Sequence, residues 1–159
     1  MGQSTNAMLM YGYHLGSGDG GWELHGLGEY GELPAFDWND PEDEDSEGFQ
    51  GDAEKKLLAD IGGFTEEWTS GVEGYWDRKR AAQARVGVEF DTHCSGSYPM
   101  YVLAAKVITV YRGDVKEIDP VQDLTVQPDW DDKLRTALNV LGLNPTQETA
   151  RWLLCSYWG

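Results

Sequence analysis

A long apolar run constrains the fold of this chain more than any other feature. It extends from Met100 to Arg112, is rich in β-branched residues, and contains one charged residue, Lys106, before its end. Successive side chains of a strand point to opposite faces of a sheet. A run that is nearly apolar at both odd and even positions therefore predicts a central strand, buried on both faces.

Four shorter segments predict the rest of the sheet. The segments 8–15 and 22–27 flank the glycine-rich turn GSGDGG, which indicates a β-hairpin. The segment 88–94 alternates between apolar and polar residues, and 115–118 follows a Gly-Asp turn as a short edge strand. These patterns predict an antiparallel sheet of about five strands.

Helical periodicity indicates three helices between these strands and two after them. The first begins near Asp52 and ends at Gly62, a second starts at an N-cap Thr65, and a third covers residues 73–86. Residues 129–157 predict a C-terminal αα-hairpin that breaks at Gly142. We therefore expect an α+β fold, in which a flexible tail (1–7) precedes one domain (8–159) whose helices pack on the sheet.

The charge of the chain is concentrated in one stretch. Nine of the eighteen residues from Asp37 to Glu54 are acidic and none is basic. Residues 1–75 hold 17 acidic residues and two lysines, whereas residues 76–159 hold eleven acidic and ten basic residues. A chain of net charge −16 is repelled by nucleic acid and by anionic membranes, so we expect no direct binding to either.

The acidic stretch is the candidate partner-binding site. Closely spaced carboxylates complement a basic protein surface, and they imitate the phosphates that a nuclease or DNA-binding protein neutralises with Lys and Arg. Tyr30, Phe36 and Trp38 are expected to add contact area beside them. The predicted binding residues are Asp37, Trp38, Asp40, Glu42, Asp43, Glu44, Asp45 and Glu47.

Two metal-binding patterns compete with this interpretation. One resembles a calcium loop, but a proline and a preceding loop replace its entering helix, and Gln50 stands where an apolar residue is usual. Its ligand positions fall on Asp43, Asp45, Glu47, Gly48 and Glu54. The other pattern is His14, Glu23 and His25 on one face of the predicted hairpin, without an evident fourth ligand. A solvated acidic loop and an ordinary polar strand face remain the simpler readings, and we assign no metal, cofactor or catalytic residue.

Two cysteines lie far apart in the sequence. Cys94 and Cys155 do not have a metal-binding spacing, and either one disulfide or two free thiols fits them. No family signature of a cysteine nucleophile surrounds Cys94, so we expect it to be buried and inert. No secretory signal is evident at residues 1–16, which favours a reducing cytoplasm and free thiols.

Two segments carry a resemblance to a known group of proteins. MLMYGYHLG (8–16) and YPMYVLAAKVITVYRGDVKEID (98–119) resemble uncharacterised small acidic proteins of actinobacterial phages and prophages. That group has no known activity, so the resemblance assigns no site residue. It implies a phage accessory protein in the cytoplasm of a bacterial host.

Together these features favour a non-enzymatic protein that binds and inhibits a basic, nucleic-acid-binding host protein. A small metal-dependent enzyme or calcium-binding module is one alternative. A phage structural or assembly protein is another, for which a homo-oligomer would be expected.

Overall fold

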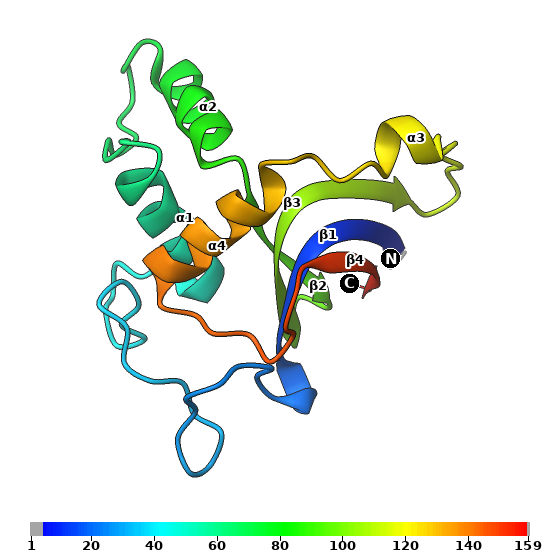
Figure 1. The fold of residues 1–159 in the computed structure, drawn as a ribbon. Coiled ribbons are helices and arrows are strands. Elements are labelled where there is room, and N and C mark those ends of the chain that lie inside the picture. The colour runs from blue at the N-terminus through cyan, green and yellow to red at the C-terminus, as the bar shows by residue number, and fades with distance from the viewer. Residues whose placement is uncertain (1–4, 159) are drawn as a thin grey trace.

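The computed structural model describes residues 5–158 and has an α+β fold (Figure 1). The four strands are β1 (Thr5–Ser17), β2 (Glu89–Cys94), β3 (Pro99–Tyr111) and β4 (Arg151–Trp158). The helices are α1 (Gly48–Asp60), α2 (Tyr75–Val86), α3 (Pro120–Asp123) and α4 (Trp130–Leu141), with a 3-10 turn η1 at Gly18–Gly20. The predicted α+β class is confirmed.

The four strands form one mixed sheet that closes on itself in the order β1-β3-β2-β4. The pairs β1–β3, β1–β4 and β2–β3 are antiparallel, whereas β2 meets β4 in parallel at one residue pair, Cys94 with Tyr157. The prediction of an antiparallel sheet of about five strands is therefore wrong in strand number and in strand direction.

β3 has the central position that its sequence predicts. It pairs with β1 along one edge and with β2 along the other. Leu103 points to the helices, while its neighbours Val102 and Ala104 face the inside of the closed sheet with Met8 and Met10. β3 is thus apolar on both faces because both of its faces are buried.

The main core lies between the sheet and three of the helices. In Figure 1, α1, α2 and α4 gather on one side of the sheet, whereas α3 lies apart near the end of β3. The predicted apolar stripe of α4 is buried through Leu134, Ala137, Leu138 and Leu141. The predicted terminations of α2 and α4 are also confirmed, because the glycines that follow them have left-handed backbones.

The largest error of the sequence prediction is the helix expected at the C-terminal end. Residues 151–158 form β4, which covers the edge of β1 from Thr5 to Gly12, so the predicted αα-hairpin does not exist. The apolar spacing of these residues fits a helix, but alternate residues also fit a strand. Cys155 and Tyr157, two residues apart, pack against the inside of the closed sheet. Pairing with a distant strand therefore decides the conformation here.

Three other predicted elements are also wrong. Residues 22–27 make only isolated bridges, Gly16 with Trp22 and Leu24 with Pro145, and β4 occupies the edge of β1 up to Gly12. Residues 115–118 form no strand. The segment 65–74 is irregular, and Trp68 is exposed, so its four-residue spacing does not mark a buried helix face.

The predicted N-terminal tail lies partly within the fold. Residues 5–7 already belong to β1, where Asn6 pairs with both Tyr111 and Tyr157. Residues 1–4 lie outside the described residues.

Candidate functional site

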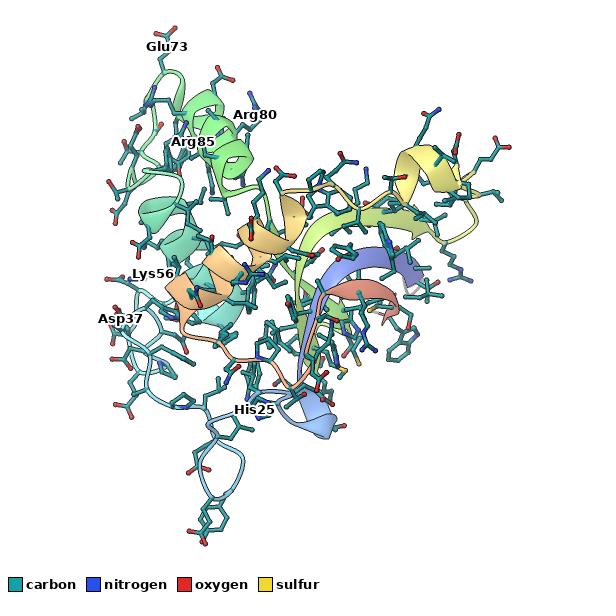
Figure 2. The ribbon with its side chains drawn as sticks, viewed as in Figure 1. His25, Asp37, Lys56, Glu73, Arg80 and Arg85 are labelled. Carbon is teal, nitrogen blue, oxygen red and sulfur yellow. The ribbon has the colours of Figure 1, made fainter. Side chains whose placement is uncertain are left out.

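The acidic segment 37–47 forms an irregular loop that leads into α1. In Figure 2, the labelled Asp37 lies near the outer side of the molecule, away from the sheet. The exposed carboxylates are those of Asp37, Asp40, Glu42, Asp43, Glu44, Asp45 and Glu47. All the acidic residues of the predicted site are therefore open to solvent.

Two successive turns give this loop a defined shape. The Asp40 carboxylate accepts a hydrogen bond from the backbone N–H of Glu42, and the Asp43 carboxylate accepts one from that of Asp45, each at 3.0 Å. Backbone bonds from Asp43 to Asp40 and from Ser46 to Asp43, each 3.1 Å long, close the same turns. Aspartate favours such turns because its side chain bonds the backbone two residues ahead.

Asp52 in α1 ties the end of the loop to the helix. Its carboxylate accepts hydrogen bonds from Ser46 Oγ at 2.7 Å, from Asn39 Nδ2 at 3.0 Å and from the backbone N–H of Glu47 at 3.0 Å. Partial burial alone would raise the pKa of Asp52, but these hydrogen bonds to the charged form outweigh it and lower the pKa. Asp52 therefore holds the loop in place and remains ionised at neutral pH.

Substituting this carboxylate should loosen the loop. We expect Asp52→Asn to lower the free energy of unfolding at pH 7 by about 1–3 kcal/mol, because an amide cannot accept from all three donors. The lowered pKa makes this contribution complete above pH 3.8, the usual value, and progressively lost as the pH falls through the folded-state pKa.

Urea unfolding of the two proteins at pH 7 and at acidic pH measures both effects. Glu44→Gln is the control, because Glu44 is exposed and its side chain forms no hydrogen bond or ion pair within residues 5–158. An equal stability of Asp52→Asn and wild type at pH 7 would contradict the role of Asp52.

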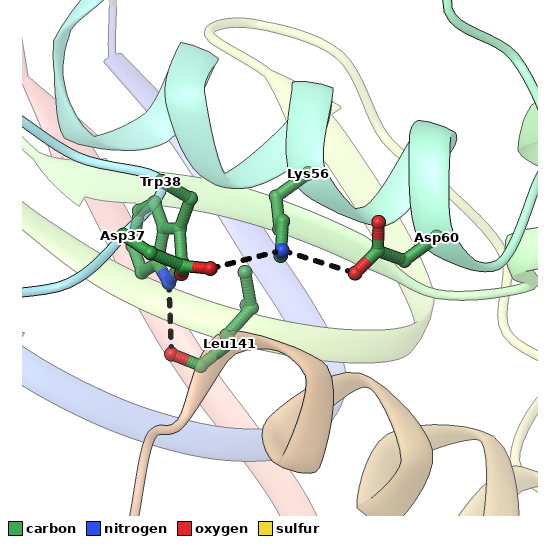
Figure 3. Close-up of polar contacts among 5 residues, drawn as sticks. All are labelled: Asp37, Trp38, Lys56, Asp60 and Leu141. Carbon is green, nitrogen blue, oxygen red and sulfur yellow. Dashed lines mark hydrogen bonds and ion pairs between the residues drawn. The ribbon is translucent and has the colours of Figure 1, made fainter.

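The Trp38 side chain packs against the rest of the protein and is not free to contact a partner. Its Nε1 donates a hydrogen bond of 2.9 Å to the carbonyl oxygen of Leu141, at the end of α4 (Figure 3). Its ring stacks on Phe36 and contacts Phe49, with ring centres 5.0 and 5.1 Å apart. Of the three aromatics expected beside the site, only Tyr30 is fully open, with 90% of its surface exposed.

The loop is poorly neutralised by the rest of the protein. Asp37 forms an ion pair of 3.4 Å with Lys56, which also contacts Asp60 at 3.1 Å (Figure 3). The acidic residues from 40 to 47 form no ion pair with any basic residue of the described chain. Other basic side chains pair elsewhere, as Arg78 does with Glu66 and Lys133 does with Asp129.

The two metal-binding patterns do not come together as their spacings suggest. Gly48 begins α1 and Glu54 lies inside it, with its carboxylate hydrogen-bonded to Gln50. Glu23 accepts from Thr146. Within residues 5–158, no three His, Cys, Asp or Glu side chains lie close enough to hold a metal ion.

His14 instead lies beside His93. Their ring centres are 5.4 Å apart, and the Nε2 atom of each is buried without a hydrogen-bond partner among the described residues. β3 lies between them, because His14 pairs with Val102 and His93 pairs with Met100. Burial, together with the charge of His14, lowers the pKa of His93 despite the opposing effect of Asp91.

This pair should make the fold sensitive to mild acid. The unfolded chain binds a proton at His93 near pH 6.5, and the folded chain binds it only at lower pH. Stability contributed by this site should fall as the pH drops from 6.5 through the folded-state pKa. In urea unfolding between pH 7 and pH 5, His93→Gln should lose less stability than wild type, whereas the exposed His25→Gln should match wild type. Equal losses in all three proteins would contradict this assignment.

Both cysteines are free thiols. Cys155 is half-buried inside the sheet, and burial raises the pKa of its thiol. Cys94 is exposed, so the expectation that it is buried is wrong. It ends β2 with a φ of 73°, a left-handed conformation that takes the chain out of the strand.

None of the helices within residues 5–158 combines the length and apolar character needed to cross a bilayer. Comparisons with protein-family models, with curated proteins and with solved structures found no match to the chain.

Proposed function

We propose that this protein is a non-enzymatic inhibitor that binds a basic host protein through its acidic loop. The loop would occupy the groove of a nuclease or DNA-binding protein and exclude the nucleic acid. One observation carries the proposal: the carboxylates of residues 40–47 are exposed, lie on a loop held by internal hydrogen bonds, and form no ion pair with the described basic residues.

The physical argument concerns charge and order together. A groove that binds phosphates presents closely spaced Lys and Arg side chains, which a run of carboxylates can neutralise in the same way. An unordered acidic tail would lose much conformational entropy on binding. The turns at Asp40 and Asp43 and the bonds to Asp52 remove part of that cost before the partner arrives.

The proposed setting is the cytoplasm of a bacterial cell infected by a phage. It rests on the resemblance of segments 8–16 and 98–119 to small phage proteins. In that setting, an inhibitor of a host nuclease or DNA-binding protein would act as an accessory protein.

A competition experiment tests this function. Immobilised protein should retain a basic partner from host lysate, and a short DNA duplex should displace that partner once it is purified. The variant Asp43→Asn/Glu44→Gln/Asp45→Asn/Glu47→Gln should bind the purified partner at least about tenfold more weakly.

A second variant with four substitutions distinguishes recognition by the loop from an effect of total charge. Asp19→Asn/Asp114→Asn/Glu117→Gln/Glu148→Gln removes the same charge from exposed positions outside the loop. It should bind almost as well as wild type. Equal weakening by both variants, or binding that DNA does not affect, would overturn the proposal.

A further inference from the structure

A cleft separate from the exposed loop lies between α1, α2 and β2. Its volume is about 590 Å³, within the range of small-ligand sites. The polar wall includes Gln50 and Glu54 of α1, Gln83 of α2, and Glu89 and Asp91 of β2. The apolar wall is formed by Leu57, Leu58, Val86, Val88, Phe90 and Ala105.

The cleft follows an edge of β2 that β4 leaves uncovered. Within the described chain, β2 pairs with β4 only at Cys94, the last residue of β2. The carbonyl oxygen of Phe90 instead accepts a hydrogen bond of 3.1 Å from Gln50 Nε2. The same amide nitrogen lies 3.2 Å from Glu54 Oε1, so Gln50 fixes Glu54 against the strand edge.

Asp91 repels both Glu54 and Glu89, and none of these three carboxylates forms an ion pair within residues 5–158. Glu54 is exposed at the mouth of the cleft, but partial burial raises the pKa of its carboxyl group; the charges of Asp91 and Glu47 add to this, while Gln50 and Lys79 oppose it. Partial burial, followed by the charge of Asp91, also raises the pKa of Glu89, although its side chain remains exposed to solvent. The Glu89 side chain has no hydrogen bond or ion pair within residues 5–158.

This combination defines the chemistry of a ligand. A cation between Glu54, Glu89 and Asp91 would relieve their repulsion and stabilise their charged forms. Beside these carboxylates the cleft presents the accessible apolar side chains of Ala84 and Ala105, which suit an aliphatic chain that carries the cation. A bare metal ion fits less well, because no three of the described His, Cys, Asp and Glu side chains lie close enough to coordinate one.

We propose that this cleft binds an alkyl cation, the ammonium or guanidinium end of an aliphatic chain, with Glu54 and Glu89 as its ion-pair partners. A lysine or arginine side chain of a bound protein and a free polyamine share this chemistry. The inference rests on the cleft alone and does not depend on what the exposed loop binds.

Backbone-amide NMR titration at pH 7 tests the proposal with defined probes. N-acetyl-arginine amide should give saturable shifts at residues 54, 83 and 89, whereas N-acetyl-citrulline amide, of similar shape but uncharged, should bind at least about tenfold more weakly. Spermidine in a separate titration distinguishes a free amine from an amino-acid side chain. Binding by either cation at the cleft supports the proposal, and binding by neither overturns it.

Two variants locate the binding. Glu54→Gln/Glu89→Gln should weaken binding of the better cation about tenfold, whereas Asp43→Asn/Asp45→Asn in the loop should leave it unchanged. If the double variant does not fold, the single variant Glu89→Gln replaces it, because the Glu89 side chain has no partner among the described residues. It should weaken binding of the cation about threefold. Shifts confined to residues 40–47, or cation binding that the Glu54 and Glu89 substitutions leave intact, would overturn the proposal. A partner whose affinity depends on the loop would leave the proposed inhibitor function standing even then.

Discussion

Replacing Gly12 with alanine is expected to destabilise the protein by about 3 kcal/mol or more, or to prevent folding. Gly12 lies on β1 and pairs with Ala104 of β3 on one side and Arg151 of β4 on the other. A Cβ atom at this position would overlap the carbonyl oxygen of Leu103 and lie 2.8 Å from the Cα of Ala104. Both are backbone atoms of the central strand, so neither can move away without breaking strand pairing.

Gly20→Ala is the matched control. A Cβ atom on Gly20 would have no neighbour within 4 Å, and its φ lies outside the left-handed region. Urea unfolding followed by tryptophan fluorescence, with far-UV circular dichroism of the native states, should show a near-normal Gly20→Ala and a strongly destabilised Gly12→Ala. A Gly12→Ala protein as stable as the control would mean that β1 and β3 do not approach as closely as described.

Replacing Phe49 with alanine should lower the free energy of unfolding by about 3 kcal/mol. This is the lower end of the range for a large aromatic residue, because the Phe49 side chain is only half-buried. Phe49 is where the loop, the helix layer and the sheet meet. Its ring lies 4.8 Å from that of Trp22, 5.1 Å from those of Trp38 and Tyr101, and 5.7 Å from that of Phe90. Its removal should leave a cavity beneath the acidic loop.

The loss should be visible both globally and locally. Urea unfolding should show the lower stability, and amide hydrogen exchange should rise at Ser46 and Glu47, whose N–H groups are bonded within the loop and to Asp52. Tyr30→Ala is the control, because Tyr30 is almost fully exposed and should change stability by less than about 0.5 kcal/mol. Unchanged exchange in Phe49→Ala would contradict the view that the aromatic cluster holds the loop.

Local signals in the sequence predict the elements whose stability is also local. The period of α4 and the glycines after α2 and α4 mark helices, because an apolar stripe and a left-handed terminus follow directly from residue type. β3 is equally predictable, since a strand that is largely buried on both faces is apolar at most positions.

Elements defined by distant partners are not predictable in this way. β4 is a strand because the edge of β1, some 140 residues earlier in the chain, needs a partner. The same pairing covers the edge of β1 up to Gly12, part of which residues 22–27 would have used for a hairpin. No pattern inside either segment carries that information, so the strand number, the mixed direction and the closure of the sheet could not be predicted.

The same distinction between local signals and distant partners applies to the candidate site. Exposure of the acidic loop follows from its composition, because unpaired carboxylates remain in water. The burial of Trp38 does not follow, because its hydrogen bond goes to Leu141, over 100 residues away. The sequence did not predict the cleft. The acidic residues at 89 and 91 alternate on a strand and therefore share a face, but α1 brings Glu54 to them from a distant part of the sequence.

The salt dependence of affinity tests the central claim most directly. Binding of the purified partner should be measured by calorimetry at 50 and 500 mM NaCl, with wild-type protein and with the variant neutralised at Asp43, Glu44, Asp45 and Glu47. The account predicts that high salt weakens wild-type binding by about tenfold or more, because screening removes attraction between the loop and a basic surface. The neutralised variant should bind weakly at low salt and change little with salt. A wild-type affinity that is the same at both salt concentrations would contradict the account.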